Sequence, residues 1–406
     1  GGADIAAAAQ DPKGWAAYGH PEWGRFRLGQ TSPDFSTSGL SAVAAQYLFA
    51  TGKDEGLTVA DVEADPVREK VRAIQSSIVH YGDTTVFFAD QLAAHGRAYA
   101  SAVAMEETTV VDFNARKRNR DRLVAIYPKE GTFFSDNPLI VLDAPWVTAD
   151  QKAGAQAFVD YLESPAIQGQ VSRYGLRPGD STVKPGGDIS AANGVDPAQP
   201  TKVLALPDPK VLARIRELWH EDRKPADVSL VLDVSGSMND QDKLAQAQEG
   251  LVTFLDQLSP RDRVSLVVFA DEPQLAAPLR ALSPDVKQGL VSTIQGLIAD
   301  GGTSVYDATL ASVQELGKTG DPTHIRAAVV LTDGVDNRST SSLDDVVAAG
   351  RKQGGEGDAT RVFTIAYGQD ADVDGLKAIA TAFGGKAYVG DPASITSVYT
   401  QISSFF

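Results

Sequence analysis

The chain has 406 residues, which at roughly 100–200 residues per domain predicts two or three domains. It carries 37 basic and 53 acidic residues, a formal net charge of −16, which argues against nucleic acid and anionic membrane surfaces as partners. Cysteine is absent, and this excludes disulfides, thiolate zinc sites, iron–sulfur clusters and cysteine nucleophiles.

No run of 18 or more apolar residues occurs, so no transmembrane helix is expected within this sequence. The first residues, Gly1–Ala6, contain neither a basic segment nor an apolar segment of the kind found in a signal peptide. We therefore expect either that a targeting segment has been removed or that the sequence is an internal fragment.

The first elements of the chain place polar groups at predicted strand ends and helix starts. The polar segment 28–39 precedes a predicted helix over 40–50, and a strand over 102–105 ends in two glutamates. Hydroxyls and free amides at a helix start can hold an anion, although helix capping explains the same residues. The candidate contacts for a small solute or anion are Ser32, Thr37, Ser38 and Glu107.

Further along, apolar segments at 123–128 and 137–142 precede a predicted helix over 149–162. The sequence pattern of four segments, residues 12–39, 127–131, 161–168 and 174–178, resembles that of bacterial extracellular solute-binding proteins. The resemblance implies an α/β module of the periplasmic-binding-protein type II kind. It also implies that lobe one is incomplete, because its leading strands are missing. We expect a processed or truncated chain, or a separate fragment that completes lobe one.

Residues 177–209 are rich in Pro, Gly, Asp and Ser, which predicts a linker or a long surface connection. A helix over 210–223 follows, with apolar residues at helical spacing. The predicted domains are a solute-binding-like module over 1–178, a linker with a connecting helix over 179–225, and a second module over 226–406.

The second module alternates strand and helix signals, which is typical of an open, mostly parallel sheet covered on both faces. We predict strands over the short apolar runs 228–233, 263–269, 327–333, 362–367 and 386–389. Helices are predicted over 243–258, 284–298, 306–316, 343–350, 374–383 and 394–402. The fold class is therefore α/β, with a doubly wound, Rossmann-like sheet in this module.

Two carboxylates stand where such a sheet places functional groups. Asp233 ends the first predicted strand, and Asp333 ends a later central strand. In a doubly wound sheet these strands are neighbours at the topological switch point, and ligands bind outside their carboxyl ends. The segments Asp233–Ser237 and Gly301–Ser304 bring hydroxyls to the same edge.

Carboxylates and hydroxyls without thiols or histidines suit a hard cation such as Mg²⁺, Mn²⁺ or Ca²⁺. Protein donors fill about five positions of an octahedron and leave one for a carboxylate of a partner. Taken alone, Ser237 also fits a helix cap, and Asp333–Gly334 also fits an ordinary turn.

The pattern D-x-S-x-S, a later G-G-T and a strand-terminal T-D-G resemble the metal-ion-dependent adhesion site of von Willebrand factor A domains. The resemblance covers about 226–406. It implies that hydroxyls of Ser235, Ser237 and Thr303 and carboxylates of Asp233 and Asp333 bind the metal, directly or through water. Mg²⁺ is the first expectation, with Mn²⁺ and Ca²⁺ as alternatives. The implied partner is a protein that offers a carboxylate to the metal.

These features predict a non-enzymatic, extracellular or cell-envelope binding protein whose first module senses or presents a ligand. The alternative is the solute-binding component of a transporter, with the A domain as an accessory. A domains also occur in intracellular chelatase and AAA-type assemblies, but the attached first module argues against that class. The five histidines lack metal-ligand spacing, and no G-x-S-x-G motif occurs, so catalysis is not expected.

Overall fold

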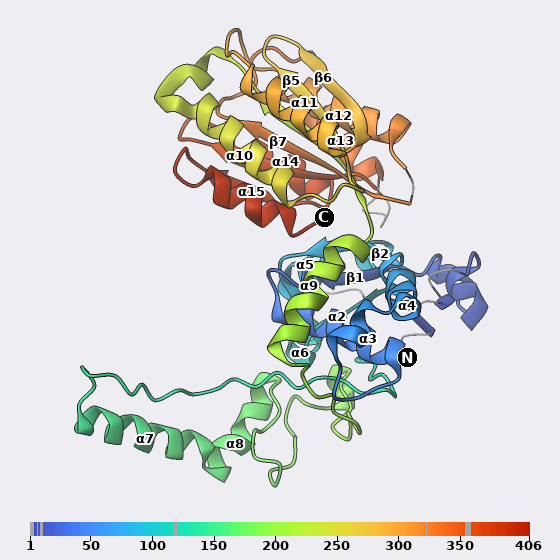
Figure 1. The fold of residues 1–406 in the computed structure, drawn as a ribbon, viewed down its shortest axis with the longest axis vertical. Helices are drawn as coiled ribbons and strands as arrows, with labels where there is room; N and C mark the ends of the chain where they lie inside the picture. Colours follow the sequence, from blue (N-terminus) through green and yellow to red (C-terminus); the bar gives the residue numbers. More distant parts are fainter. Residues whose placement is uncertain (1–3, 6, 9–10, 117–120, 322, 354–358) are drawn as a thin grey trace.

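The computed structural model describes the chain except residues 1–3, 6, 9–10, 117–120, 322 and 354–358. Two packed parts follow one another, and the helix α9 (Pro209–Asp222) leads from the first into the second (Figure 1). Among the described residues, no helix combines the length and the apolar character that crossing a bilayer requires.

The second part is built on a six-stranded sheet with the order β6-β5-β4-β7-β8-β9. Every pairing is parallel except that of β5 with the edge strand β6. The α/β class and the parallel sheet expected from the sequence are therefore confirmed. The strands are β4 (Ala226–Asp233), β5 (Arg263–Phe269), β6 (Pro273–Ala281), β7 (Ile325–Thr332), β8 (Arg361–Tyr367) and β9 (Ala387–Gly390).

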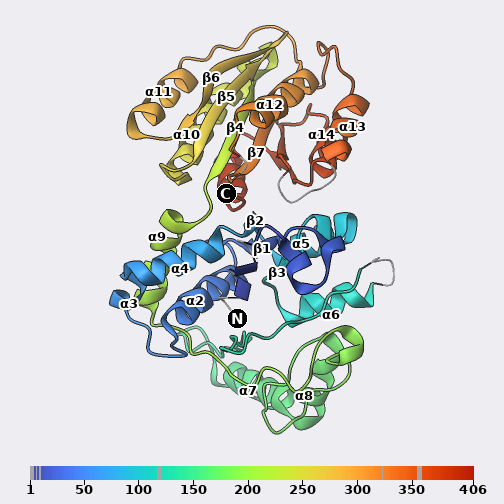
Figure 2. The same ribbon diagram turned by 90° about the vertical axis from the view of Figure 1, so that its right-hand side faces the viewer.

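Helices cover both faces of this sheet (Figure 2). Alternate residues of β4 point to opposite sides, so that Leu230 and Leu232 join one apolar cluster while Val231 joins the other. One face is covered by α10 (Lys243–Gln257), α11 (Pro284–Gln295) and α15 (Ile395–Ser403). The other is covered by α12 (Val305–Thr319), α13 (Leu343–Gln353) and α14 (Val373–Ala382).

The first part holds a small parallel sheet of order β2-β1-β3. Its strands are β1 (Leu28–Thr31), β2 (Ile78–Gly82) and β3 (Ala102–Val103). The helices around it are α2 (Thr37–Thr51), α3 (Val59–Glu63), α4 (Asp65–Gln75), α5 (Thr85–His95) and α6 (Glu107–Ala115). Helices α2, α5 and α6 begin just after β1, β2 and β3, so their N-termini gather at one edge of this sheet.

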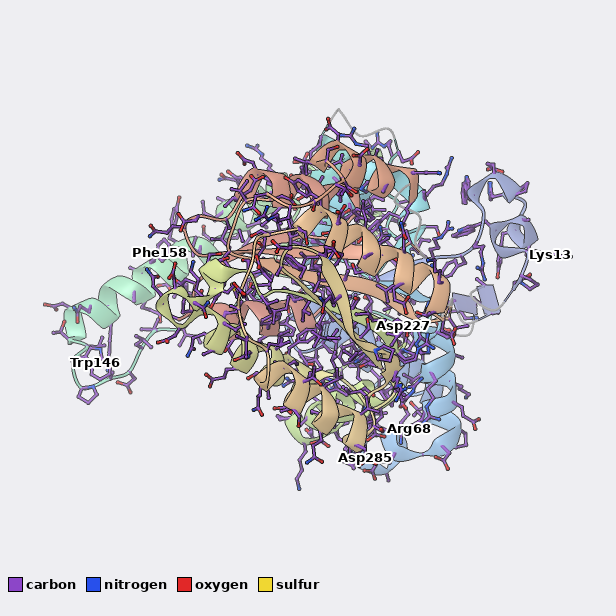
Figure 3. The ribbon with its side chains drawn as sticks, turned by 90° about the horizontal axis from the view of Figure 1, so that it is seen from above. Lys13, Arg68, Trp146, Phe158, Asp227 and Asp285 are labelled. Atoms are coloured by element: carbon purple, nitrogen blue, oxygen red, sulfur yellow. The ribbon has the colours of Figure 1, made fainter. Side chains whose placement is uncertain are left out.

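An arm of the first part, residues 134–171, projects from the body of the molecule. It consists of an extended segment followed by α7 (Ala149–Glu163) and α8 (Pro165–Val171), and α7 has no buried residue. Trp146 is 77% exposed and Ile140 75% exposed. Trp146 and Phe158 lie far out on this arm (Figure 3). The apolar segment 137–142 therefore has the composition of a buried strand but belongs to no strand here.

The Pro- and Gly-rich segment 177–209 is irregular, yet it packs against the first part. Ile189 and Val195 are buried against Val110 and Val111 of α6, and Leu204 joins the main apolar cluster. The connecting helix α9 is held by Asp222, whose buried carboxylate accepts hydrogen bonds from Arg68 and Arg72. These contacts make the segment a surface connection that is folded onto its module.

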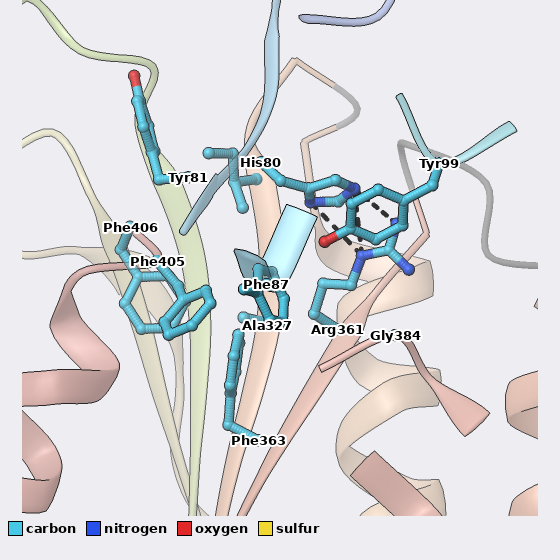
Figure 4. A pocket seen from close by; sticks show the side chains of 11 residues that line it. His80, Tyr81, Phe87, Tyr99, Ala327, Arg361, Phe363, Gly384, Phe405 and Phe406 are labelled. Carbon is cyan, nitrogen blue, oxygen red and sulfur yellow. Dashed lines mark hydrogen bonds between the residues drawn. The ribbon is translucent and has the colours of Figure 1, made fainter. Parts of the chain in front are cut away.

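The two parts meet at the edge of the large sheet where β4, β7 and β8 begin. Arg361, the first residue of β8, donates from Nη2 to Nε2 of His80 at 2.6 Å, and its guanidinium lies over the ring of Tyr99 (Figure 4). At the chain end, the ring of Phe405 packs against Phe87. The carboxyl ends of β4 and β7 therefore face away from the first part.

The interface predicts a pH dependence of stability. Burial and the charge of Arg361 hold the pKa of His80 well below its usual value. Below pH 6.5, His80 binds a proton in the unfolded chain but stays neutral in the folded chain. The free energy of unfolding therefore falls as pH falls. The loss from this one group between pH 7 and pH 5 is at most about 2 kcal/mol, the limit for a histidine that stays neutral in the folded state.

His80→Gln keeps an acceptor for Arg361 but removes this titration. We expect the variant to lose less stability than the wild type when the pH is lowered from 7 to 5, by up to about 2 kcal/mol. Urea denaturation of both proteins at the two pH values measures the difference. An equal loss in both would contradict the assignment.

Candidate metal centre

The first carboxylate of the candidate centre is the fully buried Asp233 at the end of β4. Its Oδ1 accepts the backbone N–H of Ser235 at 2.7 Å, and its Oδ2 accepts the hydroxyl of Thr332 at 2.5 Å. Burial raises the pKa of Asp233 to about 6, and the negative charge of Asp333 contributes to this rise. The hydrogen bonds from Ser235 and Thr332 lower the pKa but do not offset the rise. Among the described residues, the contacts of Asp233 are thus hydrogen bonds and not an ion pair.

The second carboxylate is Asp333, which follows β7 and is also fully buried. Ser237 donates its hydroxyl to Oδ1 at 2.7 Å, and Lys243 donates from Nζ to Oδ2 at 2.6 Å. The hydroxyls of Ser235 and Ser237 are 3.2 Å apart. Because β4 and β7 are neighbours in the sheet, the loops after them share one edge.

Thr303 comes to the same edge from the loop before α12. Gly236 N–H donates to the carbonyl of Gly301 at 3.0 Å, which ties this loop to the loop after β4. On its other side, a Cβ placed on Gly334 would lie 3.4 Å from the Thr303 hydroxyl. The structure therefore brings together the three segments that sequence analysis singled out.

Two buried carboxylates and three hydroxyls on adjacent loops form an all-oxygen donor set, which fits a hard divalent cation. In the part of the chain that the structure describes, no cluster of three or more His, Cys, Asp or Glu side chains is placed to hold a metal. Hydroxyls are thus needed as donors. Ser237 lies within a short 3-10 helix, Gly236–Asp242, whose N-cap is Ser235, and it donates its hydroxyl to Asp333, so the capping alternative does not explain its position.

Lys243 supplies the ammonium group at this centre, and no motif in the sequence pointed to it. Its side chain is 7% exposed and passes over Gly368 after β8, where an added Cβ would lie 3.4 Å from its Cε. Gln241 and Asp242 just before it both have positive φ, near 55°, which is uncommon for residues other than glycine. This left-handed turn starts α10 at Lys243 and directs its ammonium to Asp333.

In the first part, the four residues predicted to contact a small solute do not form one cluster. Ser38 donates its hydroxyl to the carboxylate of Glu106, which also accepts from Thr85 at 2.7 Å. Glu107 instead forms an ion pair with Arg177. Ser32 is buried beyond the end of β1, and Thr37 is the exposed first residue of α2. The neighbouring Glu106, rather than Glu107, lies where the three helix starts converge.

Comparison with known proteins follows the division of the fold. Residues 227–401 match the von Willebrand factor type A domain. The second part of the chain is a von Willebrand factor A domain. Residues 3–196 match bacterial extracellular solute-binding proteins. Both resemblances expected from the sequence are confirmed, and we refer to the two parts as the A domain and the solute-binding-like module.

Several curated relatives share part of the sequence. Human inter-alpha-trypsin inhibitor heavy chain H4 is 36% identical over 120 residues, which are 27% of this chain and 12% of that protein. An uncharacterized Synechocystis protein is 27% identical over 45% of this chain and 42% of its own length. Calcium-activated chloride channel regulator 1 of Bos taurus is 28% identical over 44% of this chain and 19% of its own length. The chain thus spans less than half the length of each of these relatives.

Similar solved structures include von Willebrand factor type A from Catenulispora acidiphila, at 21% identity and a TM-score of 0.40, covering 45% of this chain and 43% of that one. Another is proximal thread matrix protein 1 from the mussel byssus with a zinc-occupied MIDAS motif. It has 16% identity and a TM-score of 0.39, and the match covers 49% of this chain and 52% of that chain.

Proposed function

We propose that the A domain binds Mg²⁺ through oxygens of its three loops, and through that cation a carboxylate of a protein partner. Mn²⁺ and Ca²⁺ are alternative cations. The proposed ligands are Asp233, Ser235, Ser237, Thr303 and Asp333. The observation that carries the proposal is that two buried carboxylates and three hydroxyls lie together on adjacent loops.

The partner's carboxylate follows from the charge at the centre. Five protein oxygens leave about one position of an octahedral cation free, and a hard cation prefers an anionic oxygen there. With Lys243 paired to Asp333, the two carboxylates, the ammonium and a divalent cation leave one net positive charge. That charge favours an anionic ligand in the free position. Binding rather than catalysis is the proposed role, since a donor set with three hydroxyls suits a binding site better than a hydrolytic one.

For the solute-binding-like module, we propose a role in sensing or presenting a ligand outside the cell or at the cell envelope. Ser32, Thr37, Ser38 and Glu107 remain its proposed contacts for a small solute or anion. Delivery of a solute to a transporter is the alternative role. To test this alternative, the dye-labelled module is titrated with amino acids, sugars and phosphate. Tight binding of one solute that does not require the A domain would favour delivery to a transporter.

The exposed arm supports the proposal that a separate segment completes lobe one. An apolar run such as 138–142 is typical of a strand buried on both faces of a parallel sheet. Here its Leu139, Ile140 and Leu142 are more than half exposed. We expect limited proteolysis to cut within 134–148 first, because few contacts hold this segment. Equal cleavage in β4 or β7 would contradict this expectation.

The function is tested by binding to beads that display a Gly-Asp-Gly peptide or a Gly-Asn-Gly peptide. Multivalent display makes a weak single contact measurable. We expect the full chain to bind the aspartate beads in Mn²⁺ and not in EDTA. It should not bind the asparagine beads in either condition. Binding that is the same with and without metal, or with either peptide, would overturn the proposal.

A further inference from the structure

Exposed carboxylates surround the proposed metal centre. They lie on the loops that follow β4, β5 and β8 and on the loop before α12, all at the edge where Asp233 and Asp333 end their strands. We call these residues the acidic rim: Asp240, Asp242, Asp271, Glu272, Asp300 and Asp370.

Hydrogen bonds fix parts of this rim next to the proposed ligands. Asp271 accepts the backbone N–H of Gly302 at 2.8 Å, one residue before Thr303. Asp300 donates its backbone N–H to the carbonyl of Val234, one residue after Asp233. These links keep the two rim carboxylates on the same loops as the proposed metal ligands.

Positive charge at this edge is already paired. The described loops 234–243, 270–273, 296–304, 333–342 and 368–372 contain two basic residues. Arg338 is paired with Asp271 at 2.9 Å, and Lys243 is buried against Asp333. A loaded centre with one net positive charge would therefore sit inside a ring of negative charge.

We propose that the partner presents a single aspartate or glutamate to the metal from a basic surface. This inference rests on the proposed function and adds the charge of the partner. A partner whose ligand carboxylate is flanked by further acidic residues would bring like charges against the rim, within the Debye length of about 8 Å at physiological salt. Lysine or arginine flanks would meet the rim carboxylates instead.

Three bead-displayed peptides test the proposal: KKGDGKK, EEGDGEE and KKGNGKK. In Mn²⁺ and 50 mM salt, we expect the full chain to bind KKGDGKK at least about tenfold more tightly than EEGDGEE. The difference should shrink at 300 mM salt, since screening weakens contacts between exposed charges. KKGDGKK should also exceed KKGNGKK in Mn²⁺ but equal it in EDTA.

The outcomes separate this inference from the function on which it rests. Aspartate- and metal-dependent binding with equal or stronger binding of EEGDGEE would overturn the basic-partner proposal and leave the proposed function standing. Binding of KKGDGKK that never exceeds KKGNGKK would overturn the proposed function itself.

A rim variant gives an independent readout. The triple change Asp240→Asn, Glu272→Gln and Asp370→Asn removes three exposed charges that carry no proposed ligand role. The preference for KKGDGKK over EEGDGEE should fall several-fold, while Mn²⁺ still raises the melting temperature.

The control changes the same net charge elsewhere, with Glu55→Gln, Glu69→Gln and Asp285→Asn on the first module and at the start of α11. It should keep the preference. An equal fall in both triple variants would show that only overall charge matters and would overturn the role of the rim.

Discussion

Replacing Asp233 with asparagine is expected to abolish the rise in melting temperature that Mg²⁺ or Mn²⁺ gives the wild-type chain. The amide keeps the shape of the side chain but lacks the charge that a divalent cation requires. At a metal concentration of 100 times Kd, native-state binding contributes about 2.7 kcal/mol, which corresponds to about 5–10 °C for a domain of this size. Differential scanning fluorimetry in metal and in EDTA measures both proteins.

The pKa of about 6 at Asp233 adds a pH dependence to this result. Because protons compete with the metal for the carboxylate, the metal-dependent rise in the wild type should shrink as pH falls through 6. Without metal, the folded-state pKa lies above the usual value near 3.9, so stability is lost as pH rises through 6. Metal-free Asp233→Asn should therefore be at least as stable as the wild type at pH 7.

Asp240→Asn is the matched control for Asp233→Asn. It lies on the same loop, is exposed and is not a proposed ligand. The metal-dependent rise should survive in this variant. A rise that persists in Asp233→Asn would remove that carboxylate from the metal centre.

Replacing Lys243 with methionine is expected to destabilise the metal-free chain and to strengthen metal binding. The change keeps most of the apolar stem but leaves the buried Asp333 carboxylate without its ammonium partner. Breaking a buried ion pair by removing one member costs about 3 kcal/mol, or about 6–12 °C in melting temperature here. A bound divalent cation supplies the missing positive charge, so the metal-dependent rise should exceed that of the wild type.

Isothermal titration of Mn²⁺ into the metal-stripped chain measures the affinity directly, and Lys243→Met should bind more tightly. Lys287→Met is the matched control, because Lys287 pairs with the exposed Asp256 at the surface. Its effect should stay within about 1 kcal/mol with or without metal. An equal loss of stability in EDTA and in saturating Mn²⁺ would mean that Lys243 is not a counter-ion of the metal centre.

The strands of the A domain and the three site segments could be predicted because they are local features. A run such as Val228–Asp233 is apolar on both faces, which indicates a buried parallel strand wherever it occurs. Asp233 and Asp333 then share an edge because parallel strands end on the same side. The edge strand β6 escaped prediction because Pro273 and Pro278 interrupt its pattern and its outer face is exposed.

The groups that complete the centre could not be predicted, because their distances to it depend on turns and packing. Lys243 reaches Asp333 only because a left-handed turn starts α10 at that residue. Thr332 holds Asp233 across two strands that are 99 residues apart in sequence. The contact of Ser38 with Glu106 rather than with Glu107 likewise depends on the first turn of α6, where neighbouring residues point in different directions.

The sequence by itself determined the α/β class, the order of the elements in the A domain, and the oxygen donors that could meet at one edge of its sheet. These properties follow from residue type and short-range periodicity. Only the tertiary structure decided the pairing of Lys243 with Asp333, the acidic rim, and the packing of His80 against Arg361 between the modules. Each of these depends on side chains distant in sequence, and their mutual distance is set by how the strands and helices pack.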